Sequence, residues 1–525
     1  MKKTVAAVAF ILLYGFCAAI ILYAQQYDPE SDFQVSIRDN GNSVEINRYV
    51  GTKRTVSIPP TIQGLPVTGI GRSAFEKKNI TSVIIPDSVN GIGINAFSNC
   101  LNLTSVIIPN GVTDIEVNAF YGCASLANVT IGNNVTSIER AAFYDCVSLA
   151  RVDIPNSVTG IGFAVFQGCT SLTNVSIGYS VTSIGDQAFQ GCTSLTAINV
   201  DSGNRYYSSE QGVLYNKNKT ALIRYPQAKT DNAFTIPNSV TIIERIAFYG
   251  CAITNVTIPN NVSTIGFAAF RDCINLTNIT IGNGVTRIET SVFSDCPSLT
   301  AIHVDSGNRN YSSEQGVLYN KNKTALIRYP QAKTDNAFTI PNSVIGIGSS
   351  AFSRCTNLAN ITIPNNVIII EEYAFTDCAK LTGVTIPNSV NGIGINAFSN
   401  CTSLTSVTIG NSVTEIKGDT FRRCTSLARV AIPAGVTKIG NGAFYECTSL
   451  PGVTIPDSVT RIDGFAFSKC TGLTSVTFQG TIASNGFDTS AFYQLGDLRD
   501  NYLAGGIGTY TTTAPVGSRS VWTKQ

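Results

Sequence analysis

The sequence predicts a repeat solenoid made mostly of short parallel strands and irregular segments, built from units of about 23 residues. Three observations predict it: one aromatic residue recurs every 22 or 23 positions, a fixed apolar template surrounds it, and in most copies a cysteine follows three positions later. One unit of this size cannot bury its apolar side chains alone, so stacking on neighbouring units has to supply the core.

The marker aromatic is a phenylalanine in sixteen copies. These are Phe75, Phe97, Phe120, Phe143, Phe166, Phe189, Phe248, Phe270, Phe293, Phe352, Phe375, Phe398, Phe421, Phe444, Phe467 and Phe492. The regular spacing breaks after Phe189 and after Phe293, where the next marker follows 59 residues later, and at the final step from Phe467 to Phe492, which is 25 residues. Each long gap therefore holds an insertion of 36 residues.

The template around the marker is Leu-x-x-Val-x-Ile-Pro-x-x-Val-x-x-Ile-Gly-x-x-Ala-Phe-x-x-Cys, as in Leu149 to Cys169. The Val-x-Ile pair has the two-residue period of a strand and is β-branched, and a Pro or Gly ends it. Val-x-x-Ile-Gly predicts a second short extended piece, whose glycine permits a turn. The Ala-Phe-x-x-Cys piece predicts a single helical turn with its three named side chains on one side.

This template resembles the leucine-rich repeats of the Treponema and BspA-like type, and the resemblance covers about Ser57 to Phe492. It implies a leucine-rich repeat arc or elongated superhelix with a strand on its concave side. Several members of that family are surface proteins that bind host matrix or other cells. The template residues are the buried ones, so a ligand would contact the variable positions instead.

The chain divides into segments around this array. The repeats occupy residues 59–200, 237–304 and 341–492, and the insertions occupy 201–236 and 305–340. Residues 33–57 alternate around Asp39-Asn40-Gly41-Asn42, which predicts that residues 25–58 form a hairpin that caps the open end of the core. Residues 493–525 are polar and rich in Gly and Thr, and we expect a C-terminal tail there that carries the only tryptophan, Trp522.

The first 24 residues have the pattern of an export signal. Lys2 and Lys3 precede an apolar run from Val5 to Ala24. The pattern favours cleavage after Ala24, and a retained anchor formed by residues 5–24 or lipid attachment at Cys17 remain open alternatives. All three interpretations place the repeats outside the cytoplasm, secreted, on the cell surface or in a periplasm.

Composition excludes several classes of partner. The net charge is +2 and only 13% of residues are charged, so we expect neither nucleic acid nor an anionic membrane surface as a partner. Glycine-rich phosphate loops, zinc-protease helices and EF-hand loops do not occur in the sequence, and we expect no cofactor. The expected partner is an extracellular protein or glycan.

Fourteen of the fifteen cysteines stand three residues after a marker phenylalanine. They are Cys100, Cys123, Cys146, Cys169, Cys192, Cys251, Cys273, Cys296, Cys355, Cys378, Cys401, Cys424, Cys447 and Cys470. One cysteine per repeat predicts a structural ladder of buried free thiols. Disulfides between neighbours are an open alternative, although parallel side chains make the bridge awkward. No Cys-x-x-Cys pair occurs, which argues against a zinc site.

The two insertions are near-identical copies. Asp201 to Val240 and Asp305 to Val344 differ only at Tyr206, which is Asn310 in the second copy. Each predicts a hairpin with its turn at 216–219 or 320–323. We consider that they form a paired contact surface, because Tyr and Arg are favoured at interfaces. Its candidate residues are Tyr206, Tyr207, Tyr215, Arg224, Tyr225, Tyr311, Tyr319, Arg328 and Tyr329. The alternative is that these tyrosines pack the hairpins onto the solenoid.

A second candidate surface consists of the middle residues of the Val-x-Ile strands, which point away from the core. Along the array they are Ile84, Ile107, Thr130, Asp153, Ser176, Asn199, Thr257, Thr280, His303, Thr362, Thr385, Thr408, Ala431, Thr454 and Thr477. Neutral hydroxyl groups dominate, which suits weak and repeated contacts to glycans or extended protein. The alternative is that threonine is simply a soluble strand residue. Asp153 and His303 are the ionisable candidates for ligand contact.

Catalysis has little support. His303 is the only histidine, so a histidine-based triad lacks a second observation. Asp153 is the only acid at these strand positions, and we expect it to lie beside Arg151 rather than beside a second carboxyl group. The sequence therefore predicts an exported, adhesin-like binding protein that is not an enzyme. The alternative is a structural or self-assembling envelope protein without a host ligand.

Overall fold

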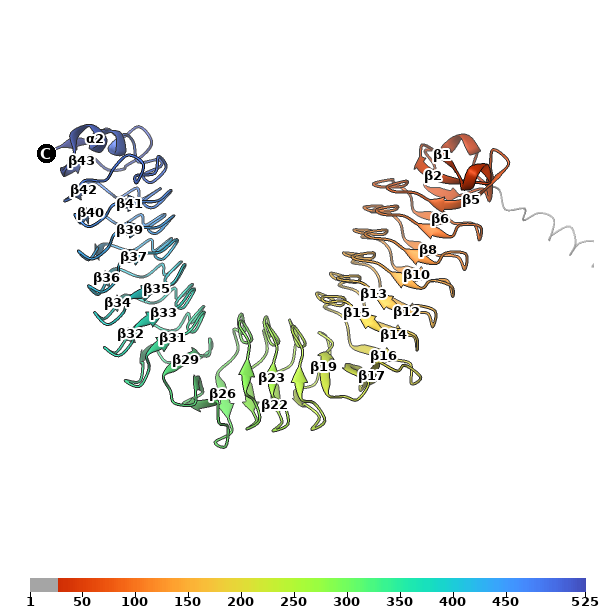
Figure 1. The fold of residues 1–525 in the computed structure, drawn as a ribbon, viewed down its shortest axis with the longest axis horizontal. Coiled ribbons are helices and arrows are strands. Elements are labelled where there is room, and N and C mark those ends of the chain that lie inside the picture. The colour runs from red at the N-terminus through yellow and green to blue at the C-terminus, as the bar shows by residue number, and fades with distance from the viewer. Residues whose placement is uncertain (1–26) are drawn as a thin grey trace, which may run out of the picture. The chain divides into compact units, whose positions relative to one another are not determined.

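The computed structural model describes residues 27–525, so the predicted export segment and Cys17 lie outside the described residues. The chain forms two compact units, one ending at Gly212 and the other running from Val213 to Gln525. Within each unit the strands of successive repeats stack side by side (Figure 1). The predicted repeat solenoid is therefore confirmed.

Every full repeat contributes a longer strand from its Val-x-Ile segment. These strands form several sheets, and within a sheet they pair in parallel one repeat apart, as in Val152↔Val175↔Ile198. In the first unit they are β3 (Thr55–Ser57), β6 (Ser82–Ile84), β8 (Ser105–Ile107), β10 (Asn128–Thr130), β12 (Arg151–Ile154), β14 (Asn174–Ile177) and β16 (Ala197–Val200). In the second unit they are β20 (Ala233–Thr235), β22 (Asn255–Ile258), β24 (Asn278–Ile281), β26 (Ala301–Val304), β30 (Ala337–Thr339), β32 (Asn360–Thr362), β34 (Gly383–Thr385), β36 (Ser406–Thr408), β38 (Arg429–Ala431), β40 (Gly452–Ile455) and β42 (Ser475–Phe478).

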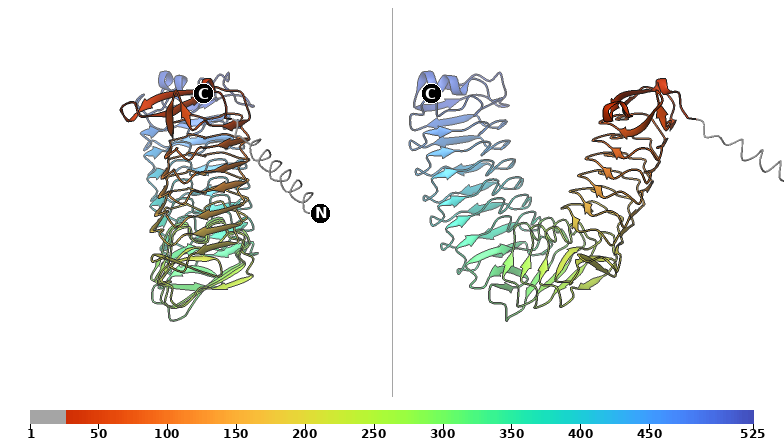
Figure 2. Two further views of the ribbon diagram at one scale, coloured as in Figure 1. Left: turned by 90° about the vertical axis from the view of Figure 1, so that its right-hand side faces the viewer. Right: turned by 45° about the vertical axis from the view of Figure 1, so that its right-hand side comes forward.

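The Ile-Gly segment gives a second ladder of two-residue strands, visible beside the first in the rotated views of Figure 2. In the first unit these strands are β7 (Gly91–Ile92), β9 (Asp114–Ile115), β11 (Ser137–Ile138), β13 (Gly160–Ile161) and β15 (Ser183–Ile184). In the second unit they are β21 (Ile242–Ile243), β23 (Thr264–Ile265), β25 (Arg287–Ile288), β31 (Gly346–Ile347), β33 (Ile369–Ile370), β35 (Gly392–Ile393), β37 (Glu415–Ile416), β39 (Lys438–Ile439) and β41 (Arg461–Ile462).

The Ala-Phe-x-x-Cys segment corrects one expectation, because it forms consecutive tight turns rather than a single helical turn. In the Phe97 repeat, Asn95 and Asn99 have φ angles of 57° and 58°. These angles lie in the left-handed region, which Asn tolerates well. The left-handed residues turn every second backbone N–H group toward the next repeat. Phe97 N–H donates to Ala119 O at 2.7 Å, whereas Cys100 N–H closes onto Phe97 O at 3.2 Å. The turns therefore join the inter-repeat hydrogen bonding, which a helical turn would keep internal.

The core of each unit is a stack of the marker rings. Neighbouring ring centroids lie 4.9 Å apart for Phe75–Phe97 and 5.0 Å apart for Phe375–Phe398, with nearly parallel planes. The fourteen ladder cysteines lie beside this stack, buried and with free thiols. Each thiol points at a backbone carbonyl one repeat earlier. That carbonyl usually belongs to the marker, as in Cys123 Sγ to Phe97 O at 3.1 Å, whereas Cys251 and Cys355 point at the carbonyls of Tyr225 and Tyr329. One aromatic ring and one thiol per repeat therefore fill the interior.

The N-terminal end of the first unit is closed by a hairpin. Strands β1 (Phe33–Arg38) and β2 (Ser43–Tyr49) pair antiparallel around the 3-10 turn η2 (Asp39–Gly41), after a first 3-10 turn η1 (Glu30–Asp32). Strand β2 then pairs in parallel with β5 (Leu65–Ile70). Strand β5 also pairs antiparallel with the short β4 (Thr61–Ile62) and in parallel with β7, the first strand of the short-strand ladder. The Tyr49 ring stacks on Phe75 at 5.2 Å and so covers the first rung.

The C-terminal residues 493–525 are a folded cap, which corrects the expectation of a polar tail. They contain α2 (Leu498–Gly505), β43 (Gly508–Thr511) and β44 (Thr523–Lys524), and β43 pairs antiparallel with β42. Trp522 is 2% exposed, and its Nε1–H donates to Leu495 O at 2.6 Å. The apolar residues of this cap follow no repeat period, so the repeat template did not predict that they are buried. Across residues 27–525, no helix has the length and apolar character needed to cross a membrane.

Candidate binding surfaces

The middle residues of the longer strands form an exposed surface in each unit, which we name the strand face. Of the fifteen positions given by the sequence, all are exposed except Ser176 and Thr477, which are half-buried. Their strand neighbours on either side are mostly buried, as in the alternating pattern of β12 and β22. The two-residue period thus places one free side chain per repeat on this face.

The side chains of the strand face lie in register across neighbouring repeats. Asp153 pairs with Ser176 and then Asn199, while Thr257 pairs with Thr280 and then His303. Such pairs on parallel strands lie about 4.8 Å apart in the direction of the ladder. The face therefore offers rows of hydrogen-bonding groups at the spacing of the strands.

Asp153 is the exposed acid of the strand face. Its carboxylate forms an ion pair with Arg151 at 3.1 Å, as the sequence predicted. A hydrogen bond from Ser176, followed by the contact with Arg151, holds the pKa of Asp153 below its usual range. Asp153 is therefore ionised at neutral pH. Within residues 27–525, no group of three or more His, Cys, Asp or Glu side chains is arranged to hold a metal ion.

The N-terminal part of the strand face is apolar. Ile84 and Ile107 are 49% and 67% exposed on the adjacent strands β6 and β8. They line a shallow hollow of about 550 Å³ together with Thr130, Asn110 and Asn133. Carbon surface and amide groups meet here, a combination that suits the mixed polar and apolar surfaces of proteins and sugars.

The insertions form three strands each, β17 (Tyr207–Glu210), β18 (Val213–Asn216) and β19 (Ala221–Arg224) in the first copy and β27 (Tyr311–Glu314), β28 (Val317–Asn320) and β29 (Ala325–Arg328) in the second. Most of the residues proposed from sequence as contacts are buried: Tyr215, Tyr225, Tyr319 and Tyr329 are at most 1% exposed, and Arg224 and Arg328 at most 5%. These side chains pack the insertions onto the solenoid and do not project. Tyr207 and Tyr311 are half-buried, and Tyr206 is exposed, at 54%.

Two of the insertion tyrosines continue the ring stack. Tyr225 stacks on Phe248 at 5.0 Å, and Tyr329 stacks on Phe352 at 5.1 Å. Each lies 23 residues before its partner, the ordinary repeat spacing, so the sequence contained a signal for this role. Sequence reasoning missed it because tyrosine replaces phenylalanine there. The end of each insertion is therefore a degenerate repeat.

Tyr207 and Tyr311 close the open edges of two short-strand ladders. Strands β15 and β25 are the last of their ladders. The Tyr207 hydroxyl accepts a hydrogen bond from Ile184 N–H at 3.1 Å, and the Tyr311 hydroxyl accepts one from Ile288 N–H at 2.9 Å. Both tyrosines are half-buried, and they satisfy backbone donors that the interruption would otherwise leave unpaired.

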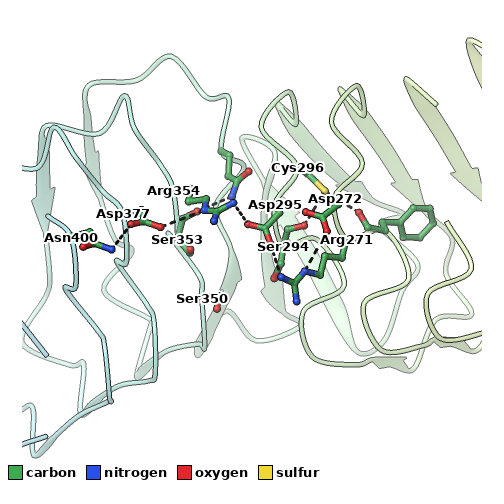
Figure 3. Close-up of polar contacts among 12 residues, drawn as sticks. Arg271, Asp272, Ser294, Asp295, Cys296, Ser350, Ser353, Arg354, Asp377 and Asn400 are labelled. Atoms are coloured by element: carbon green, nitrogen blue, oxygen red, sulfur yellow. Dashed lines mark hydrogen bonds and ion pairs between the residues drawn. The ribbon is translucent and has the colours of Figure 1, made fainter. Parts of the chain in front are cut away.

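A chain of charged side chains crosses the second insertion, as Figure 3 shows. Asp295, from the repeat before the insertion, contacts Arg271 at 3.1 Å and Arg354, from beyond the insertion, at 2.5 Å. Arg354 also reaches Asp377 at 3.4 Å, and Asn400 donates to the other oxygen of Asp377 at 2.9 Å. These contacts join the repeats on the two sides of the insertion.

Comparison with known proteins extends these observations. Residues 68–196, 225–335, 331–451 and 393–513 match the BspA type leucine rich repeat region, which is found in six copies. A solved leucine-rich repeat protein from Eubacterium ventriosum is 27% identical, with 66% of this chain and 83% of that chain covered and a TM-score of 0.50. A leucine rich cell surface protein from Faecalibacterium prausnitzii is 30% identical, with 87% of this chain and 96% of that chain covered and a TM-score of 0.38. No curated protein matches the chain.

Proposed function

This chain belongs to the BspA-type leucine-rich repeat family, and on that premise we propose that it is an exported, adhesin-like binding protein. Its partner is an extracellular protein or glycan, and it has no catalytic role. Solenoids of this kind are typically binding scaffolds, because their repeats present an extended surface of variable side chains.

The observation that carries the proposal is the exposure of the strand face. Thirteen of its fifteen side chains are exposed, and most are short and uncharged, so a partner meets little charge to desolvate. Threonine hydroxyls both donate and accept hydrogen bonds, and their repetition along the ladder allows many weak contacts to act together. The exposed pair Ile84 and Ile107 adds apolar area at one end.

We assign the contact to the strand face rather than to the insertions. The insertion tyrosines and arginines are largely buried, so only Tyr206 among them offers much side-chain area to a partner. Asp153 and His303 are exposed within the strand face and supply its ionisable contacts.

Two observations support export. Residues 2–24 have the charge and hydropathy pattern of an export signal. The 30% identical relative from Faecalibacterium prausnitzii is described as a cell surface protein. Both agree with a partner outside the cytoplasm.

The test is binding of residues 25–525 to an array of matrix glycoproteins and glycans, repeated with two triple variants. The test variant carries Ile107→Lys, Thr362→Lys and Thr408→Lys on the strand face. The control carries Leu101→Lys, Thr356→Lys and Thr402→Lys, which are exposed positions in the same repeats that follow the ladder cysteine.

We expect selective, saturable binding that the test variant weakens at least about tenfold and the control leaves within about twofold, since three buried lysines at a contact add desolvation costs. Equal effects of the two variants would contradict the assignment to the strand face. No selective binding to any partner on the array would favour a structural or self-assembling role instead.

A further inference from the structure

The N-terminal cap leaves one strand edge open. Strand β1 is the terminal strand of its sheet, and β2 is its only strand partner among the described residues. It extends over six residues without interruption, because the β-bulge of this hairpin lies in β2, where Asn47 has no partner on β1. The free edge of a strand this long carries backbone N–H and C=O groups that can pair with another strand.

Other ends of the strand ladders are closed by specific groups. At β3, Asp28 N–H donates to Ser57 O at 2.9 Å, and the Asp28 carboxylate accepts from Ser57 N–H at 2.9 Å. At β16, Val200 N–H donates to Ser209 Oγ at 2.9 Å. The last strand, β44, has only two residues and carries Lys524, and both features discourage pairing with another chain. Strand β1 is longer, and no hydrogen bond from another segment closes its outer side in the part of the chain that the structure describes.

The free backbone groups of β1 belong to Val35 and Ile37. Val50 N–H donates to Asp32 O at 2.8 Å, so the backbone at Asp32 faces β2. Backbone groups along an antiparallel strand alternate between its two sides, which turns those of Phe33, Val35 and Ile37 outward. The Phe33 N–H closes the preceding η1 turn. Val35 and Ile37 therefore retain both their N–H and their C=O groups for a further strand.

The side chain of Ile37 is the uncovered end of a buried apolar layer. Val35 lies opposite Ile46 on β2, and Ile37 lies opposite Val44. Residues that are directly paired point to the same face of a sheet, and both Ile46 and Val44 are fully buried in the core. Ile37 is nevertheless 61% exposed, because no strand lies beyond β1. A further strand on this edge therefore covers apolar surface as well as pairing the backbone.

A second copy of β1 fits this edge when it runs antiparallel about a two-fold axis at Ser36. Val35 of each copy then lies opposite Ile37 of the other, so each pair exchanges both backbone hydrogen bonds and extends the apolar layer. An axis at Val35 would instead set Ile37 opposite Phe33, whose N–H is already used. The axis at Ser36 therefore satisfies the free groups of both edges.

The charges of β1 agree with this axis. Arg38 lies opposite the neutral Gln34 of the other copy, so no like charges meet across the pair. The charge of Arg38 is also paired within its own chain, with Glu45 at 2.9 Å. The edge is therefore self-complementary in backbone groups, apolar side chains and charge.

We propose that two copies of this chain associate weakly through antiparallel pairing of their β1 strands, with the two-fold axis at Ser36. A pairing of two short strands buries less than the roughly 1,200 Å² of stable interfaces, so the dimer depends on concentration. The sheet that contains β1 also contains short strands and none of the strands of the strand face. The association therefore leaves the strand face free and does not depend on the function assigned to that face.

The first test is sedimentation velocity on residues 25–525 from about 1 µM to about 300 µM, a range that covers weak association. The test variant is Ile37→Lys, which places a charge in the paired edge. Its control is Ile274→Lys, since Ile274 is similarly exposed, at 58% against 61%, but lies in the second unit. Thermal unfolding establishes whether each variant is folded.

The second test is cross-linking of introduced cysteines under mild oxidation with copper–phenanthroline. At the axis the two copies of Ser36 form a non-hydrogen-bonded pair with Cα atoms about 4.5 Å apart, a separation that a disulfide can bridge. Ser36→Cys is therefore the test variant. Gln34→Cys is the control, because its two copies lie about 13 Å apart along the strands. The native thiols of residues 25–525 are buried and stay out of the reaction.

We expect concentration-dependent dimers that Ile37→Lys weakens at least about tenfold and Ile274→Lys leaves within about twofold, because a lysine in the paired edge loses hydration. Ser36→Cys gives a covalent dimer and Gln34→Cys does not. A monomer at every concentration, or equal effects of the two lysine variants, would overturn the pairing. Cross-linking of Gln34→Cys as readily as Ser36→Cys would overturn the axis. If Ile37→Lys fails to fold, the two cysteine variants still decide.

Discussion

The guanidinium of Arg354 lies 2.5 Å from the carboxylate of Asp295, and this contact joins two repeats that the second insertion separates in sequence. Asp295 is mostly buried, with 16% of its side chain exposed, and it also binds Arg271. Where the ladder of short strands is interrupted, ion pairs thus replace part of the lost strand pairing.

The first prediction concerns this ion pair. Arg354→Met and Asp295→Asn should each increase hydrogen exchange of the amides in residues 289–295, and the pair should show a coupling energy of about 1 kcal/mol in a double-mutant cycle. The effect should shrink in about 1 M salt, because Arg354 is partly exposed. The Arg423–Glu446 pair, at 2.7 Å within the uninterrupted array, is the control. Unchanged exchange in 289–295 would show that the pair does not hold the two sides together.

The second prediction concerns Tyr329 as a rung of the ring stack. Tyr329→Ala should destabilise the second unit by about 3–5 kcal/mol, the usual cost of removing a buried aromatic ring. Tyr329→Phe should cost only about 1 kcal/mol, since it loses the hydroxyl contact with Asp335 but keeps the ring. Denaturant titration measures both, with Phe375→Ala as the reference for an ordinary rung. A cost for Tyr329→Ala far below that of Phe375→Ala would mean that the insertion is not part of the core.

The third prediction concerns the C-terminal cap. Trp522→Ala should cost about 3–5 kcal/mol and expose the last repeats to proteolysis, because the buried indole covers the end of the core. Val521→Ala, at a neighbouring position that is 68% exposed, should have little effect. Limited proteolysis followed by mass spectrometry distinguishes the two. Equal resistance of both variants to proteolysis would mean that residues 493–525 are a tail that does not cover the end of the core.

The fourth prediction is a loss of stability at alkaline pH. Burial raises the pKa of Cys100, Cys251, Cys355 and Cys424 to about 12, well above the ordinary value of a thiol. Because the pKa of each buried thiol is higher in the folded than in the unfolded chain, the protonated thiol makes its full contribution to the free energy of unfolding below about pH 8.5. That contribution is lost as pH rises toward 12, by about 1.4 kcal/mol per pH unit for each thiol. Because nearly every repeat carries one, the decline should be steep.

Circular dichroism against pH, with thiolate absorbance recorded in parallel, measures this decline. Unfolding and thiolate formation should occur together above about pH 9, since the thiols ionise only when the chain opens. Replacing Cys378, Cys401 and Cys424 by alanine should make the decline shallower. Thiols that ionise in the folded protein near pH 8.5 would contradict their burial.

The repeat fold could be predicted from sequence because a buried position recurs with the same residue type in every unit. Phe, Cys, Val and Ile each fill one place in the stack, so their spacing reports the stacking itself. The helical turn was wrong, since the left-handed angles at residues such as Asn95 and Asn99 depend on hydrogen bonds to the next repeat. The residue pattern within one repeat does not show these hydrogen bonds to the next repeat.

The candidate sites could be predicted from the sequence only in part. The strand face follows from the two-residue period, and its exposure agrees with that period. The insertion residues were judged by type, but Tyr225, Tyr329 and Arg328 are buried because the insertions return to the repeat register at their ends. A cleft beside Arg328 is lined by residues 288–294, 327–328, 348–350 and 371, which are distant in sequence, and no local motif marks it.

The most direct test of the strand face uses the burial of the native thiols. Single cysteines introduced by Ile107→Cys or Thr408→Cys on the strand face, and by Leu101→Cys or Thr402→Cys as controls, can be labelled selectively with a maleimide while the native thiols stay protected. The labelling rate is measured with and without a saturating partner from the binding array. We expect the partner to slow labelling at one or both strand-face positions at least about tenfold while the controls keep their rates, because bound surface excludes the reagent. Protection of the controls with free labelling of both strand-face positions would contradict it.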